Sequence, residues 1–175
     1  LGQQAARFQH DSVIHAGDEL AMGELFWRAL AVPGHDMEAL AFYNPERRIL
    51  ISGDALWENG FGVIFSELLG EGDGIAVTRA TLEMLSRLPI DIVIPGHGSP
   101  FAGVDAAFAR AFRRVDSFAA DIDKLAWHAI KVLVSFAMLE RGRLPAGEFP
   151  AFILGLPFAS SINHRYLNLP DDRLV

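Results

Sequence analysis

Apolar and polar residues alternate over much of the first third of the chain, and this period of two predicts β-strands. Four runs show it, over residues 19–22, 25–32, 39–43 and 48–51. The tetrapeptide Asn44-Pro45-Glu46-Arg47 has the residues of a tight turn. We therefore expect the last two runs to form a hairpin.

The middle of the chain mixes loop, helix and strand signals. Residues 57–74 are rich in glycine, which predicts a loop with some local packing at a functional edge. Residues 75–88 have the apolar spacing of a helix that Pro89 would end. The β-branched run 90–94 is typical of a strand buried within a sheet.

The last third of the chain is predicted to be helical. From Val104 to Leu125, apolar residues recur at steps of three and four, which predicts one long amphipathic helix. A second helix is expected over 127–141, ended by Gly142. No regular structure is predicted for 157–175, where the pattern loosens.

Composition narrows the class of protein. Half of the 175 residues are hydrophobic (51%), which is enough for a core, and the net charge is −7. A protein that binds nucleic acid normally carries a concentrated basic face, whereas the longest basic cluster is Arg113-Arg114, so we expect no such partner. The most apolar stretch has about 15 residues, fewer than the roughly 20 needed to span a bilayer. We expect a soluble, cytoplasmic protein with no membrane partner.

Three glycine turns follow apolar runs and carry residues that bind metals. They hold His35 after Pro33-Gly34, Asp54 after Gly53, and His97 after Pro95-Gly96. Each alone is an ordinary turn or capping residue, but loops that follow the strands of an α/β sheet converge at one edge. Imidazole and carboxylate groups suit zinc, and the absence of cysteine excludes thiolate ligands. Together the three residues predict a metal site.

Four segments resemble the later motifs of the metallo-β-lactamase superfamily. They are Pro33-Gly34-His35, the hairpin 39–51, Gly53-Asp54-Ala55-Leu56 and Pro95-Gly96-His97-Gly98. The resemblance implies an α/β fold, the C-terminal half of an αββα sandwich with a helical C-terminal extension. The implied domains are the second half of the metallo-β-lactamase-like domain at 1–116 and the helical extension at 117–175.

The resemblance also implies a role for each ligand. His35 would join one metal, Asp54 would bridge two, and His97 would join the other. The family's His-x-His-x-Asp-His motif, which supplies most of the other ligands, is absent, and the only histidines before His35 are His10 and His15. We therefore expect two zinc ions in the intact protein, but weak or absent binding, and no catalysis, by this chain alone.

Two further features near the predicted site have alternative interpretations. Asp36 stands where a threonine or serine commonly follows the motif histidine, and it is either an outer carboxylate that orients an imidazole or a solvent-facing turn residue. The segment 57–62 follows Asp54 directly. It forms either a lip over the metals or a hydrophobic plug beneath the loop.

The function implied by the resemblance is hydrolysis of an ester or thioester in a small-molecule substrate through a metal-bound hydroxide. The alternative is a non-catalytic binding or assembly module that keeps half of the fold. An upstream His-x-His-x-Asp-His segment in the encoding gene would favour the enzyme. Because half a sandwich leaves a sheet face or edge open, we also predict a homo-oligomer formed through exposed sheet surface.

Overall fold

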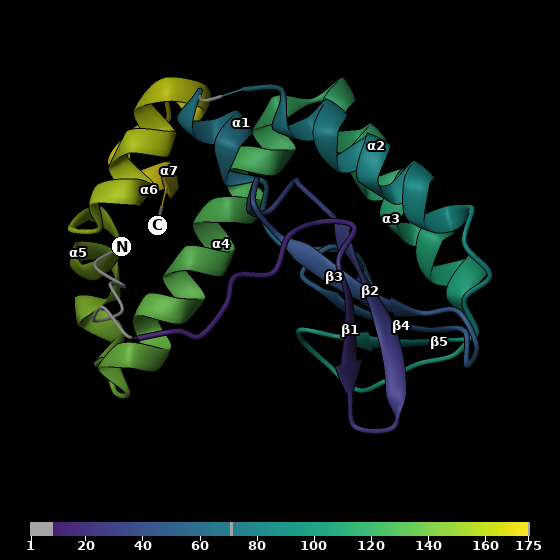
Figure 1. Cartoon of the computed structure of the whole chain (residues 1–175). Helices are drawn as coiled ribbons and strands as arrows, with labels where there is room; N and C mark the ends of the chain where they lie inside the picture. The colour runs from purple at the N-terminus through teal and green to yellow at the C-terminus, as the bar shows by residue number, and fades with distance from the viewer. Residues whose placement is uncertain (1–8, 71, 175) are drawn as a thin grey trace. The chain divides into compact units, whose positions relative to one another are not determined.

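The computed structural model describes residues 9–70 and 72–174 (Figure 1). The chain divides into two compact units, one extending to Ala119 and the other beginning at Ala120. The first unit holds a sheet with helices and all three predicted metal-binding residues. All regular elements of the second unit are helices or helical turns within the described residues.

One five-stranded sheet forms the first unit, in the order β1-β2-β3-β4-β5. The strands are β1 (Glu19–Met22), β2 (Leu25–Ala31), β3 (Leu40–Asn44), β4 (Ile49–Gly53) and β5 (Ile92–Pro95). The first four pair antiparallel, and β5 pairs parallel to β4. The four predicted strands and the predicted hairpin are confirmed. At the hairpin turn the Asn44 side chain accepts the Arg47 backbone N–H at 2.6 Å.

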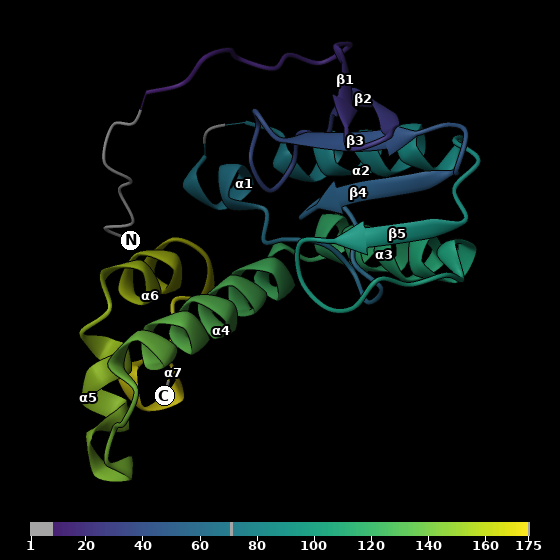
Figure 2. The ribbon, with the colours of Figure 1, turned by 60° about the horizontal axis from the view of Figure 1, so that its bottom comes forward.

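Two helices, α2 (Gly74–Ser86) and α3 (Val104–Ala120), run along one face of this sheet (Figure 2). They cover the side that carries Tyr43, Leu50 and Val93, all of them buried. The predicted loop at 57–74 also contains a short helix, α1 (Phe65–Leu69), closed by Gly70 in the left-handed conformation with φ 72°. A single helical turn is too short for apolar spacing to reveal it.

The prediction that residues 90–94 are buried within the sheet is wrong, because β5 is an edge strand. Val93 faces the helices and is fully buried, whereas Ile92 and Ile94 point to the opposite face and are 41% and 37% exposed. The outer edge of β5 is paired in part, since Val93 exchanges two backbone hydrogen bonds with Phe101 at 2.9 and 3.0 Å. An apolar run cannot distinguish an edge strand from a central one, since only the strand order decides this.

The prediction of one helix from Val104 to Leu125 is also wrong, because the chain breaks at Asp121. Asp121 has extended backbone angles (φ −156°, ψ 98°), and its carboxylate accepts the Asp123 N–H at 3.2 Å. It thereby caps the start of α4 (Ile122–Arg141). Apolar residues keep the same spacing on both sides of the break, so the pattern conceals it. The end of α4 at Gly142 (φ 76°) matches the prediction.

In the second unit α4 packs against α6 (Pro157–Ile162) and a π-helical turn, η2 (Asn163–Leu167). The remaining elements are η1 (Ala146–Glu148), α5 (Phe149–Leu154) and α7 (Asp171–Leu174). Residues 157–174, for which the sequence pattern predicts no structure, therefore consist largely of short helical turns. No helix in the described part of the chain is both long enough and apolar enough to cross a membrane.

Replacing Tyr43 with phenylalanine should reduce the loss of stability at alkaline pH. The buried phenol donates to the Pro89 carbonyl at 2.8 Å, and burial raises the pKa of Tyr43 above its ordinary value. The folded protein then holds this proton more tightly than the unfolded one, so the free energy of unfolding falls as pH rises above about 10. Urea unfolding should show a smaller alkaline fall in the free energy of unfolding for Tyr43→Phe. At neutral pH this variant should be about 1 kcal/mol less stable than the wild type, because it lacks the hydrogen bond to Pro89. An equal alkaline fall in both proteins would contradict this.

The face of the sheet opposite α2 and α3 should mediate self-association. Strand register places the half-buried Phe42, Ile49 and Ile51 beside the exposed Ile92 and Ile94 on that face. A contiguous apolar patch of this kind favours association in water. Sedimentation velocity of the wild-type chain should therefore reveal oligomers at high concentration.

A double variant, Ile92→Thr with Ile94→Thr, should shift this equilibrium towards monomer. A matched control is Phe26→Ser, because Phe26 is 67% exposed but lies on the other face of the sheet. A wild-type chain that remains a single monomeric species at high concentration would count against the prediction.

Candidate metal centre

The three predicted ligands follow strands that run in the same direction. Since β2 and β4 are each antiparallel to β3, they run the same way, and β5 is parallel to β4. His35, Asp54 and His97 come shortly after the carboxyl ends of β2, β4 and β5. The turns after β4 and β5 are joined directly, because the Gly96 N–H donates to the Gly53 carbonyl at 2.8 Å. The sheet topology therefore brings the three residues to one edge.

Helix α2 holds the turn that carries His35. The Thr81 hydroxyl donates to the Pro33 carbonyl at 2.7 Å. At Gly34 the backbone has φ 152°, and a Cβ there would lie only 2.6 Å from the Thr78 hydroxyl. Glycine is therefore required at this position both for its conformation and for the close approach to α2.

The orientation of His35 is set by a backbone carbonyl. His35 Nδ1 lies 2.7 Å from the Val63 carbonyl oxygen. A carbonyl only accepts hydrogen bonds, so Nδ1 carries the proton and donates it, which leaves the lone pair of the neutral imidazole on Nε2. His35 Nε2 lies 3.6 Å from Asp54 Oδ2. This is the arrangement in which proteins commonly present a histidine to a metal.

Asp54 lies between the two imidazoles. Its Oδ2 faces His35, and its Oδ1 lies 3.8 Å from His97 Nε2. Two glycines leave room for the carboxylate and the imidazole: a Cβ on Gly62 would lie 2.7 Å from the His35 ring, and a Cβ on Gly96 would lie 2.8 Å from Asp54 Oδ1. The backbone is thus packed directly against the site.

The segment 57–62 has features of both predicted roles, the lip over the site and the hydrophobic plug beneath the loop. Trp57 reaches the site, since its indole N–H lies 3.1 Å from Asp54 Oδ1 and its ring meets His97 edge-on at 5.1 Å between centroids. Phe61 instead is buried and packs edge-on against Phe118. Sequence reasoning did not assign the indole N–H to Asp54. The only signal was a tryptophan three residues after the aspartate, which is a common spacing without specific meaning.

The remaining candidates near the motifs have ordinary roles. The exposed Asp36 accepts the Glu38 backbone N–H at 2.8 Å, so it is a turn residue and not a carboxylate that orients an imidazole. Upstream, His10 is exposed, and the exposed His15 has Asp18 as its neighbour. Neither histidine completes the group around Asp54 in the described residues.

The donor atoms around Asp54 suit two ions better than one. Two tetrahedral zinc ligands, each about 2.1 Å from the ion, lie about 3.4 Å apart. The separations of 3.6 and 3.8 Å from the Asp54 oxygens to the two imidazoles are close to that value. Within residues 9–70 and 72–174, however, no three histidine, aspartate or glutamate side chains are grouped to hold a single ion. Each side of Asp54 therefore presents two donors, one from the carboxylate and one from an imidazole.

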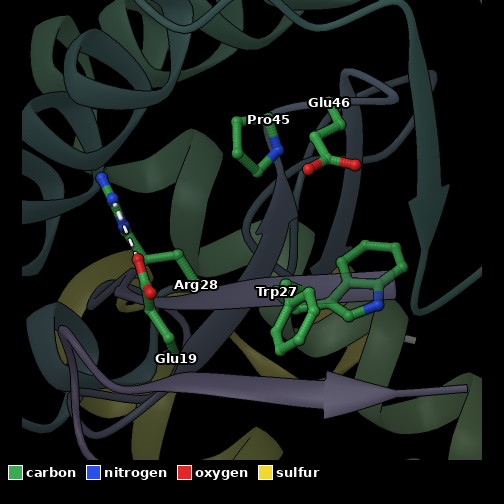
Figure 3. A pocket seen from close by; sticks show the side chains of 6 residues that line it. Glu19, Trp27, Arg28, Pro45 and Glu46 are labelled. Carbon is green, nitrogen blue, oxygen red and sulfur yellow. Dashed lines mark hydrogen bonds and ion pairs between the residues drawn. The ribbon is translucent and has the colours of Figure 1, made fainter. Parts of the chain in front are cut away.

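A separate pocket of about 240 Å³ lies away from this centre (Figure 3). Its lining comes from β1, β2 and the turn after β3 and consists of Glu19, Phe26, Trp27, Arg28, Pro45 and Glu46. Two of these lining residues, Arg28 and Glu19, form an ion pair at 3.1 Å. Because β3 runs opposite to β4, the turn after β3 lies at the other end of the strands from Asp54. The pocket is therefore not part of the candidate metal centre.

Comparison with known proteins gives consistent matches. A family model described as the metallo-β-lactamase superfamily matches residues 2–97, more than half of the 175 residues. A hydroxyacylglutathione hydrolase from Bartonella tribocorum is 31% identical over 84 residues, which cover 48% of this chain and 31% of the relative. An acyl-coenzyme A thioesterase from Homo sapiens is 24% identical over 128 residues, which cover 72% of this chain and 44% of the relative.

Among solved structures, a β-lactamase domain protein from Burkholderia ambifaria matches with a TM-score of 0.60 and 25% identity. The match covers 67% of this chain and 37% of that protein. The α/β fold predicted from the sequence, with its flanking helices and helical C-terminal region, is confirmed. The chain spans only about a third to somewhat less than half of the length of these relatives.

A methyl group at Gly62 should disturb the centre specifically. It would lie 2.7 Å from the His35 ring and 3.0 Å from Asp54 Cβ, so Gly62→Ala must displace one of them. We expect a loss of about 1–3 kcal/mol in the free energy of unfolding, as for other overpacked sites. The ring resonances of His35 should also move in NMR spectra. A suitable control is Gly147→Ala, because a Cβ there meets nothing within 4 Å. Equal behaviour of the two variants would show that the backbone is not packed as described.

Proposed function

Because the chain belongs to the metallo-β-lactamase superfamily, we propose that the protein is a metal-dependent hydrolase of ester-type or thioester-type bonds. The observation that carries the proposal is the position of Asp54, whose two oxygens each face a different imidazole. A carboxylate oriented in this way is suited to bridging two ions of the zinc class. The proposal concerns the whole protein, of which this chain supplies one part of the centre.

The residues present fit particular roles in such a centre. His35 would hold one ion through Nε2, since its Nδ1 proton is engaged by the Val63 carbonyl. His97 would hold the other through Nε2, and Asp54 would bridge both. When bound, such ions supply Lewis-acid chemistry, which lowers the pKa of water and polarises an acyl carbonyl. The half-buried Trp57 borders the centre on the side of His97.

The names of two relatives support a proposal for the substrate class. Hydroxyacylglutathione and acyl-coenzyme A, which appear in the names of two relatives, are both thioesters of small molecules. An acyl thioester has a reactive carbonyl and a good leaving group, so it needs water activation more than it needs a strong general acid. We therefore propose a small-molecule thioester as the substrate, and we expect a cytoplasmic protein with zinc as its metal.

The second candidate is a non-catalytic binding or assembly module that keeps this half of the fold. It is favoured by the absence of a His-x-His-x-Asp-His sequence from the 175 residues and by the two donors found on each side of Asp54. Such a module would bind partners through the open sheet face. An encoding gene that continues upstream with the missing motif would favour the enzyme instead.

Metal analysis together with thioester hydrolysis separates the two candidates. This chain alone should retain little zinc and hydrolyse no thioester, because each ion has only two donors. A longer form, where the gene encodes one, should hold two zinc ions and hydrolyse an acyl thioester. In that form Asp54→Ala should abolish both properties, whereas Asp36→Ala should leave them unchanged, since Asp36 only closes an exposed turn. A longer form without zinc or hydrolysis would contradict the proposed function.

A further inference from the structure

The Asp54 carboxylate needs a partner that fixes its rotation. The terminal torsion of an aspartate side chain is broad and roughly two-fold, so by itself it does not hold each oxygen towards one imidazole. The indole N–H of Trp57 lies 3.1 Å from Asp54 Oδ1 and 3.2 Å from the Gly53 carbonyl. Oδ1 is the oxygen that faces His97. A donor placed here stabilises one rotation of the carboxylate over the others, and hydrogen bonds to a charged group are the stronger ones.

Trp57 also restrains His97 through its ring. The two rings meet edge-on with their centroids 5.1 Å apart, which is a favourable geometry for aromatic pairs. His97 is otherwise exposed, with its side chain 59% accessible to solvent. One side chain therefore contacts both members of the Asp54–His97 pair.

Helix α3 in turn holds the loop that carries Trp57. The backbone of Trp57 pairs with Gly60, with its N–H donating to the Gly60 carbonyl at 2.7 Å. Arg110 Nε donates to the Glu58 carbonyl at 2.7 Å. The Arg114 guanidinium lies so close to Gly60 that a Cβ there would be 2.5 Å from Nη1, and Gly60 has φ 135°. Two arginines of one helix thus contact the turn between Trp57 and Gly60.

We infer that Trp57 is a positioning residue of the metal centre, acting through the Asp54 carboxylate and the His97 ring and held in place by Arg110 and Arg114. The inference rests on the proposed metal site, because the orientation of Asp54 matters only where two ions share it. Trp57 makes its hydrogen bond through the indole N–H and packs through its rings. Trp57→Phe removes the hydrogen bond and keeps most of the ring packing, so it separates the positioning role from the packing role.

The first experiment tests the contact in this chain without metal. The indole N–H resonances of selectively ¹⁵N-labelled tryptophan are recorded for the wild type and for Asp54→Ala. We expect the Trp57 resonance to shift and its hydrogen exchange to accelerate in the variant. Trp27 serves as an internal reference, because its Nε1 is buried and has no hydrogen-bond partner within the described residues. An unchanged chemical shift and exchange rate of the Trp57 indole N–H in Asp54→Ala would overturn the inference.

The second experiment measures Zn²⁺ affinity by calorimetric titration, in this chain and in any longer form that the gene encodes. Loss of an outer partner of a metal ligand typically weakens metal binding by about 10-fold to 100-fold. We expect Trp57→Phe to weaken Zn²⁺ binding by about 10-fold. Its thermal unfolding midpoint should be no lower than that of Trp27→Phe. The matched control Trp27→Phe removes an N–H that has no hydrogen-bond partner among the described residues, and it should leave the affinity unchanged.

The possible outcomes are distinct. Equal Zn²⁺ affinity in wild type and Trp57→Phe overturns the positioning role and leaves the proposed function intact. Absence of Zn²⁺ binding from every wild-type form contradicts the proposed function and, with it, the positioning role, whereas the indole resonance still tests the contact between Trp57 and Asp54 separately. If Trp57→Phe does not fold, Arg110→Ala replaces it, since loosening the loop at Glu58 should shift the same resonance and weaken Zn²⁺ binding in the same direction.

Discussion

The parallel pairing of β4 with β5 is the constraint on which the candidate centre depends. It joins the ends of two strands that are far apart in the sequence, and the hydrogen bond from Gly96 to Gly53 continues the pairing into the two turns. Because Gly96 has no Cβ, which would lie 3.0 Å from the Gly53 carbonyl carbon, the two backbones approach closely enough for Asp54 and His97 to face each other. The helix between these strands makes the connection possible, since parallel strands require a long crossover.

Around this pairing, Asp54 organises the rest of the centre. His35 reaches its Oδ2 from the end of β2, and Trp57 and His97 reach its Oδ1. Each of these groups is held by a further contact, His35 by the Val63 carbonyl and Trp57 through the loop that Arg110 binds. Contacts within the chain therefore largely preorganise the candidate centre. Such preorganisation is the condition for precise placement of a metal and a reacting group.

Within the described first unit, helices cover one face of the sheet (Figure 2). Helices α2 and α3 bury Tyr43, Leu50 and Val93, whereas Ile92 and Ile94 on the opposite face stay exposed. Each side of Asp54 likewise presents one carboxylate oxygen and one imidazole. Both features occur in a chain that spans less than half of the length of the relatives it matches.

Local sequence by itself determined the four antiparallel strands, helix α2 and the turns that carry His35, Asp54 and His97, because alternation, helical spacing and glycine turns act over a few residues. Tertiary structure alone decided the exposure of β5, since an edge strand and a central strand have the same apolar run. It also decided the break at Asp121, where a capping side chain interrupts an unbroken apolar period. The contact between Trp57 and Asp54 was likewise decided only by tertiary structure. Its hydrogen-bond geometry depends on how the loop packs against α3 and not on the spacing of residues.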